Sequence, residues 1–133
     1  MPGSEPGLAP GDVVRVPFPY VDRNRRQHRP ALVVSRGGIG PGGGLLWVAM
    51  ITSAANQGWA DDVLIEDHEA AGLPVASVIR PVKIATIETA RAERVGRLPP
   101  ASFARVRAIL AELLAAGTEG WKNEGTTWPI AST

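Results

Sequence analysis

Glycine and proline are too frequent in this chain for a helical bundle. Its 133 residues include 15 Gly and 12 Pro, about a fifth of the total. Both residues are unfavourable inside helices and common in turns, so we predict short strands joined by many turns. The length suits one domain, and a hydrophobic fraction of 44% is too high for an intrinsically disordered chain.

Six or seven β-strands are predicted from apolar and β-branched runs. Residues 12–18 alternate like a half-buried strand, whereas residues 45–52 form a continuous apolar run that suits the middle of a small barrel, with Trp47 in the core. Pro81 interrupts a further β-rich region and indicates an edge or a bulge. The remaining strands are expected at residues 31–35, 62–66, 75–82, 83–87 and 94–98.

One amphipathic helix follows the strands. Pro99 and Pro100 are expected to start it and Gly117 to end it. Its apolar side chains fall on one face: Phe103, Val106, Ile109, Leu110, Leu113 and Leu114. The pattern predicts a mainly β fold, a small antiparallel β-barrel with a C-terminal α-helix. We divide the chain into a disordered lead-in (residues 1–10), the barrel domain (residues 11–117) and a polar tail (residues 118–133).

Composition excludes several classes of protein. The chain has no cysteine, so it has no disulfide, no cysteine-based zinc site and no thiol nucleophile. The N-terminal residues do not resemble a signal peptide, and the longest strongly apolar run, residues 45–51, is too short to cross a bilayer. We therefore expect a soluble, cytoplasmic protein with no membrane partner.

Charge is distributed unevenly along the chain. A net charge of +1 argues against a protein that coats nucleic acid by bulk charge. However, residues 12–36 hold six arginines and two acids, whereas residues 61–69 hold five acids and no Lys or Arg. The small net charge therefore arises because a basic segment and an acidic segment cancel each other, and a local basic patch is expected.

Two motifs do not carry the function that they first suggest. Residues 38–43 match the glycine pattern of a dinucleotide site, but they lead into a strand and not into a helix N-terminus, so we interpret residues 37–44 as a flexible flap. His68 lies between two acidic residues, but three adjacent side chains in a turn cannot all converge on one ion. We therefore predict neither a metal site nor a cofactor.

Arg29 and Thr52 are the strongest candidates for a site. Pro30 ties Arg29 to a rigid strand, and a positioned arginine is suited to stabilising charge that develops on a phosphorus centre. Thr52 and Ser53 end the long apolar strand, where their hydroxyls either donate to a phosphate oxygen or simply cap the strand end. If the two strands are hairpin partners, Arg29 and Thr52 lie at the same end of the sheet.

Other cations and one aromatic residue extend this candidate site. Arginine side chains in the loop before Arg29 form a compact basic segment suited to phosphate, or else a merely solvated loop. Trp59 either stacks on an unpaired base or is an ordinary surface aromatic. The candidate RNA-binding residues are Arg23, Arg25, Arg26, Ser53, Trp59, Arg80 and Lys83.

The order of motifs resembles the MazF/PemK family of toxin endoribonucleases from type II toxin–antitoxin systems. The segments that carry the resemblance are GDVVRVPFPYVD, HRPALVVS, VAMITS, GLPVASVIRPVKIATI and RVGRLP, between Gly11 and about Leu114. The resemblance implies an SH3-like barrel, a homodimer, a cognate antitoxin and sequence-specific, metal-independent cleavage of single-stranded RNA. Such cleavage is expected to leave 2′,3′-cyclic phosphate and 5′-hydroxyl ends.

Family likeness also assigns roles to residues. The family's arginine before proline corresponds to Arg29 and its strand-end threonine to Thr52, while Arg80 matches an arginine that PemK-like members place near the substrate. Such members commonly have an acidic or amide residue two positions after it, where this chain has Val82. The general base is therefore open, and His28 and Asp22 are the candidates.

A binding protein without catalysis is the alternative. CcdB-like toxins that poison DNA gyrase use the same barrel, and other barrels bind nucleic acid as regulators. These functions do not need an arginine and a threonine at one sheet edge, so the pair favours the nuclease.

Overall fold

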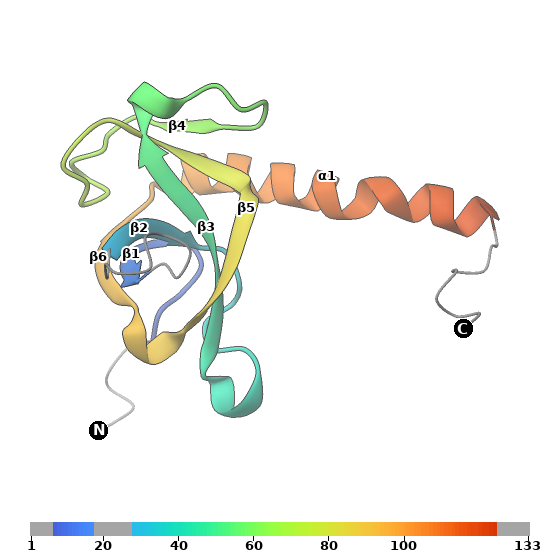
Figure 1. Ribbon diagram of the computed structural model, residues 1–133, viewed down its shortest axis with the longest axis horizontal. Helices are drawn as coiled ribbons and strands as arrows, with labels where there is room; N and C mark the ends of the chain where they lie inside the picture. The colour runs from blue at the N-terminus through green and yellow to red at the C-terminus, as the bar shows by residue number, and fades with distance from the viewer. Residues whose placement is uncertain (1–6, 18–27, 125–133) are drawn as a thin grey trace.

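Six strands form one antiparallel sheet within residues 7–17 and 28–124, the part of the chain that the computed structural model describes, with side chains up to residue 115. The sheet curls into a half-barrel with α1 (Pro100–Glu124) leading away from it (Figure 1). The strand order is β4-β5-β3-β2-β1-β6. The strands are β1 (Asp12–Pro17), β2 (His28–Val33), β3 (Leu45–Ser53), β4 (Val63–Ile65), β5 (Ser77–Glu88) and β6 (Glu93–Arg97).

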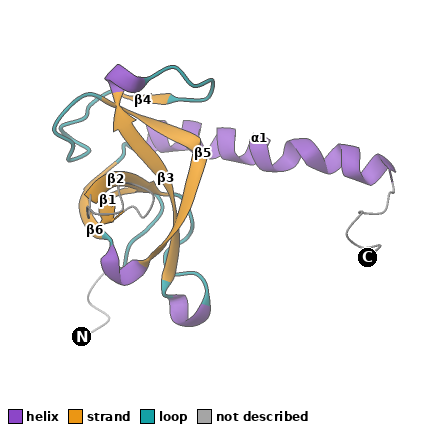
Figure 2. Cartoon of the chain, in the orientation of Figure 1, coloured by secondary structure: helices purple, strands orange, loops and turns teal. Residues whose placement is uncertain are grey.

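The predicted fold class is confirmed. Strands make up most of the body, and α1 is the one long helix in the described part of the chain (Figure 2). Three short 3₁₀ turns, at Pro41–Gly43, Ala54–Asn56 and Thr89–Arg91, lie between the strands of these residues. Within the same range α1 does not combine the length and apolarity that a bilayer span requires.

Side chains of the central strands alternate between two hydrophobic clusters. Val13 and Leu32 belong to the first cluster, while Val14 and Ala31 belong to the second, and all four are fully buried. Successive side chains of a strand point to opposite faces, so both faces of β1 and β2 are covered. α1 contributes the buried Val106 to the first cluster, which anchors the start of the helix on the sheet.

β5 passes through Pro81 as one strand, whereas the sequence predicts two strands, 75–82 and 83–87. Its pairing with β3 jumps from Arg80, opposite Met50, to Ile84, opposite Ala49. Residues 81–83 therefore form a bulge in which proline's missing N–H removes no ladder hydrogen bond. The bulge explains why Pro81 bends the strand without ending it.

The expectation that Trp47 lies in the core is wrong. Leu46 and Val48, its neighbours on β3, are fully buried, and Trp47 is 51% exposed. The period of two that buries its neighbours on one face turns the tryptophan toward the other face. The continuous apolar run of β3 therefore overstates how much of the strand is buried.

α1 starts where proline predicts but does not stop at Gly117. It continues to Glu124, because a single glycine costs a helix only about 1 kcal/mol relative to alanine and does not break it. The predicted apolar face also covers less than expected: Leu113 and Leu114 are 44% and 79% exposed. The C-terminal part of α1 extends beyond the sheet (Figure 1).

The glycine-rich segment 37–44 is folded against the start of β3. The Ile39 N–H donates to the Leu45 carbonyl oxygen at 2.8 Å, and the Leu45 N–H donates to the Ile39 carbonyl oxygen at 3.0 Å. Gly38, Gly40, Gly42 and Gly43 have positive φ angles, which few other residues adopt. These contacts give the segment a defined turn, and its mobility as a flap stays a prediction.

The segment before β5 packs against β6 through two glycines. A Cβ atom on Gly96 would lie 2.1 Å from the Ala71 carbonyl oxygen, and one on Gly72 would lie 2.2 Å from the Val95 carbonyl oxygen. Only glycine allows the two backbones to approach this closely. The contact fixes the position of residues 72–75, which line the cleft described below.

We predict that Gly96→Ala destabilises the fold, because the added methyl group meets backbone that cannot rotate away. The free energy of unfolding in urea should fall by about 2–3 kcal/mol. Gly44→Ala is the matched control, because the nearest atom to its Cβ is 3.6 Å away and its φ is −88°. Equal stability of Gly96→Ala and Gly44→Ala would contradict the close contact.

Candidate functional site

A cleft of about 530 Å³ opens at the end of the sheet where β2 begins and β3 ends. Residues of β1, β2, β3 and β6 contribute to it, together with the short helix Ala54–Asn56, the segment 72–75 and the start of β5. The residues that line it are Arg15, His28, Arg29, Pro30, Ile51, Thr52, Ser53, Asn56, Gly72, Leu73, Pro74, Val75, Ser77 and Val95.

Strand pairing brings Arg29 and Thr52 into this cleft. β2 begins at His28 and not at residue 31 as predicted, so Arg29 belongs to the strand. β2 and β3 pair antiparallel with Ala31 opposite Met50, and the same register extended by two residues places Arg29 level with Thr52. The prediction that both lie at one end of the sheet is confirmed, because both line the cleft.

The described lining of the cleft is cationic. Arg15, Arg29 and His28 line it, and none of these lining residues is Asp or Glu. Arg15 lies 3.9 Å from Glu93, with both side chains largely exposed, so this ion pair is weak. Arg29 makes no ion pair within 4.0 Å with the residues that the structure describes. The cleft therefore suits an anion.

Hydroxyl groups at the end of β3 differ in their contacts. The Oγ atom of Ser53 accepts a hydrogen bond of 3.1 Å from the Ala55 N–H and caps the short helix Ala54–Asn56. Ser53 also lines the cleft, so its binding to a phosphate oxygen stays a prediction. The Oγ1 atom of Thr52 instead accepts a hydrogen bond of 3.0 Å from Asn56 Nδ2. The O–H of Thr52 is thereby left to point elsewhere.

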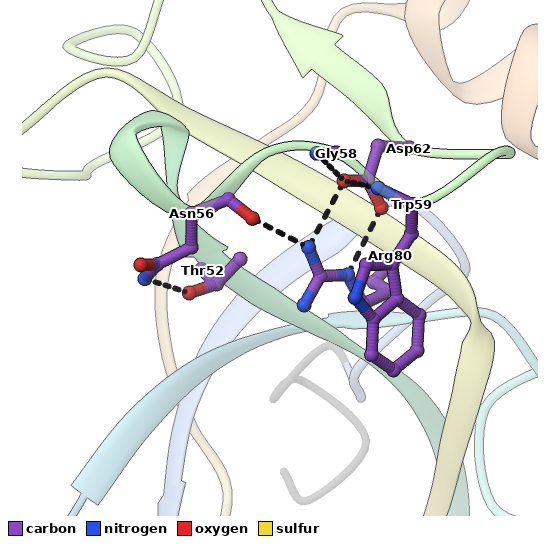
Figure 3. A network of polar contacts seen from close by, with 6 residues as sticks. All are labelled: Thr52, Asn56, Gly58, Trp59, Asp62 and Arg80. Atoms are coloured by element: carbon purple, nitrogen blue, oxygen red, sulfur yellow. Dashed lines mark hydrogen bonds and ion pairs between the residues drawn. The ribbon is translucent and has the colours of Figure 1, made fainter.

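A buried ion pair holds the loop beyond Thr52. Arg80 donates from Nε and Nη2 to the two carboxylate oxygens of Asp62, each at 3.0 Å (Figure 3). Nη2 also donates to the Asn56 carbonyl oxygen at 2.9 Å, and Asp62 accepts from the N–H groups of Gly58 and Trp59. The side chains of Arg80 and Asp62 are 9% and 5% exposed. We call these contacts the Arg80 clasp.

Electrostatics and an aromatic ring reinforce the clasp. The hydrogen bond from Arg80 lowers the pKa of Asp62 against the opposing effect of burial, and the N–H groups of the loop lower it further. The Arg80 guanidinium lies 4.0 Å from the centre of the Trp59 ring, a cation–π distance, and Lys83 Nζ lies 5.9 Å from it. The ring therefore covers the ion pair and keeps water from it.

Three of the expected RNA-binding residues lie at the clasp and not in the cleft. Arg80 is part of the clasp, the Trp59 ring covers it, and Lys83 lies close to that ring. Arg80 is committed to an internal ion pair, while Trp59 keeps 49% of its surface exposed. Asp22, Arg23, Arg25 and Arg26 lie outside the described residues. His28 is exposed and lines the cleft beside Arg29.

Sequence reasoning missed several lining residues. Arg15 is opposite Pro30 in the β1–β2 pairing, and its polar position between Val14 and Val16 was the available signal. Asn56 and residues 72–75 reach the cleft through loop conformations that no periodicity indicates. Among the described residues, no three His, Cys, Asp or Glu side chains come together as a metal site would require.

We predict that Asp62→Asn weakens the fold by about 3 kcal/mol at pH 7, because it leaves a buried guanidinium without its counter-charge. The pKa of Asp62 is lowered in the folded protein. Its stabilisation is therefore complete above the ordinary Asp value near 4 and is lost as the pH falls through the folded-state value. Urea unfolding across pH 7 to 3 should show the wild-type advantage shrinking below about pH 4.

Asp61→Asn is the matched control for that measurement, because it removes a neighbouring charge that forms no ion pair within the described residues. It should leave the stability at pH 7 nearly unchanged. Two results would contradict the clasp. One is a stability difference between wild type and Asp62→Asn that stays constant down to pH 3, and the other is an equal loss of stability in Asp61→Asn.

Known families and structures agree with the fold. A family model described as "PemK-like, MazF-like toxin of type II toxin-antitoxin system" matches residues 9–114. MazF from Deinococcus radiodurans is similar with 26% identity and a TM-score of 0.61, over 82% of this chain and 97% of that chain. A MazE–MazF complex from the same organism is similar with 25% identity and a TM-score of 0.63, over 81% and 95%.

A mycobacterial endoribonuclease in complex with its cognate antitoxin shares the fold, with 18% identity and a TM-score of 0.60 over 93% of this chain and 99% of that chain. No match is found among curated proteins. The family model nevertheless spans most of the sequence, in agreement with the motifs and the half-barrel. The chain belongs to the PemK-like, MazF-like toxins of type II toxin–antitoxin systems.

Proposed function

We propose that the protein is a metal-independent endoribonuclease toxin that cleaves single-stranded RNA at short sequence motifs. The observation that carries the proposal is the cleft itself, in which Arg29 and Thr52 share a surface with no described carboxylate among its lining residues. Cationic side chains next to a hydroxyl group fit the negatively charged phosphodiester of a nucleic acid. The family, and the similarity to an endoribonuclease in complex with its cognate antitoxin, support a nuclease over a gyrase-poisoning or regulatory barrel.

RNA carries its own nucleophile, which explains why so few groups suffice. The 2′-hydroxyl attacks the adjacent phosphorus and the bond to the 5′-oxygen breaks, leaving a 2′,3′-cyclic phosphate and a 5′-hydroxyl. A base takes the 2′-hydroxyl proton, and an acid gives a proton to the departing oxygen. The protein has only to position the phosphate, stabilise its charge and move these protons.

Each candidate residue has a part in this scheme. Arg29, held in β2 by its position before Pro30, binds the non-bridging oxygens as negative charge develops. Thr52 donates its hydroxyl hydrogen to a phosphate oxygen. His28 lines the same cleft and is the candidate base or acid near neutral pH. Arginine itself is a poor proton carrier because its guanidinium group keeps its proton under ordinary conditions.

Partners follow from the same surface. MazE–MazF complexes are among the similar structures, and we propose that a cognate antitoxin with an acidic segment competes with RNA for the cationic cleft. We also propose that the active form is a homodimer, because 133 residues provide one small barrel domain and a groove for an RNA strand would be completed by a second copy. Action on RNA fits a cytoplasmic location.

We predict that wild-type protein cuts single-stranded RNA in EDTA and that Arg29→Ala reduces the rate by about a hundredfold or more. Thr52→Ala should reduce it about tenfold to a hundredfold, the range expected for a hydrogen bond to a charged group. Rates of appearance of end-labelled fragments, under single turnover, measure both losses.

Arg36→Ala is the matched control, because Arg36 is an exposed arginine that does not line the cleft. It should keep close to the wild-type rate, and thermal unfolding should show that all three variants are folded. Failure of the wild type to cut RNA at any concentration, with retained RNA binding, would favour the binding alternative. Equal rates for Arg29→Ala and Arg36→Ala would place the chemistry elsewhere.

A further inference from the structure

We propose that Asn56 is a positioning residue that orients the Thr52 hydroxyl toward the cleft, and that the Arg80 clasp holds Asn56 in place for this purpose. The inference rests on the proposed function of Thr52 and adds a residue that lies outside the strands. Thr52, Asn56 and Arg80 form one chain of hydrogen bonds from the cleft to β5 (Figure 3).

The direction of the hydrogen bond decides what Thr52 can do. A hydroxyl has one hydrogen to donate and two lone pairs that accept. Asn56 Nδ2 donates to Thr52 Oγ1 at 3.0 Å, so one lone pair is used and the hydroxyl hydrogen remains free. Both residues line the cleft, and the free hydrogen is therefore available to a phosphate oxygen. Without Asn56 the hydroxyl can rotate and hydrogen-bond elsewhere.

The backbone around Asn56 is held at three points. Ala54 N–H donates to the Ala76 carbonyl oxygen at 2.8 Å, and Ala55 N–H donates to the capping Ser53 hydroxyl. The Asn56 carbonyl oxygen accepts from Arg80 Nη2 at 2.9 Å. An exposed side chain such as that of Asn56 normally samples several rotamers, and fixing its backbone reduces the entropy lost when it bonds Thr52.

The Arg80 side chain is linked to Thr52 through this loop. Its guanidinium is fixed by Asp62 and covered by the Trp59 ring, so the loop from Asn56 to Asp62 wraps around one buried cation. A shift of the guanidinium would move the Asn56 carbonyl and with it the amide that contacts Thr52. Arg80 and Asp62 therefore support the site at a distance from the substrate.

A double-mutant cycle between Asn56 and Thr52 tests the proposal. Asn56→Ala should lower the rate at saturating RNA by about five- to tenfold, the value of one neutral hydrogen bond, with little change in KM. In the Thr52→Ala background the same substitution should change the rate by less than about twofold, because its target is gone. Gln57→Ala, the exposed neighbour in the loop, should leave the wild-type rate unchanged.

Asn56→Asp provides a second variant with the same shape and no N–H. Its carboxylate would accept from the Thr52 hydroxyl and turn the hydrogen away from the cleft, so the rate should fall at least as far as in Asn56→Ala. The Thr52→Ala background separates this effect from simple repulsion of phosphate by the new charge.

Each outcome supports or overturns the proposal. If Asn56→Ala is as fast as wild type, or if its loss is unchanged in the Thr52→Ala background, Asn56 does not act through Thr52 and the inference fails while the nuclease function stands. If wild-type protein does not cut RNA, the proposed function fails and the inference fails with it. A full rate in Asn56→Asp would show that Asn56 only fills space.

Discussion

The antiparallel pairing of β2 with β3 is the constraint on which the site depends. In antiparallel neighbours the start of one strand meets the end of the other. Ala31 opposite Met50 therefore carries Arg29 and Thr52 to the same edge of the sheet, although 23 positions (29 to 52) separate them in sequence. β3 pairs with β5 on its other side, and the segment before β5 also lines the cleft.

A buried ion pair gives this edge its shape. Arg80 and Asp62 are almost fully covered, and desolvating two charges offsets most of their attraction, so the pair adds little net stability over apolar side chains. What it supplies is a single loop conformation, since the carboxylate and the guanidinium together bind the backbone of Asn56, Gly58 and Trp59. The chemistry proposed for the cleft needs such fixed groups, because the RNA brings its own nucleophile.

Much of this could be predicted from the sequence where the signal is local. Periodicity identified the strands and the helix, and a proline and a strand end identified Arg29 and Thr52. Contacts between distant segments could not be predicted: Asp62 belonged to an acidic run, and nothing in the run marked it as the partner of Arg80. The predictions for Trp47 and Gly117 were wrong. The apolar character of Trp47 does not show whether neighbours cover it, and the helix-breaking tendency of Gly117 does not show whether the helix continues.

In the proposed reaction the 2′-hydroxyl of RNA is the nucleophile, and Arg29 stabilises the negative charge that develops on the phosphate. The most direct measurement compares an RNA oligonucleotide with the same oligonucleotide carrying one 2′-deoxynucleotide immediately 5′ to the cleaved phosphate. We predict that the deoxy substrate binds equally well and is not cut at that bond, while the RNA yields a 2′,3′-cyclic phosphate. Cleavage of the deoxy substrate at the RNA rate would contradict the claim.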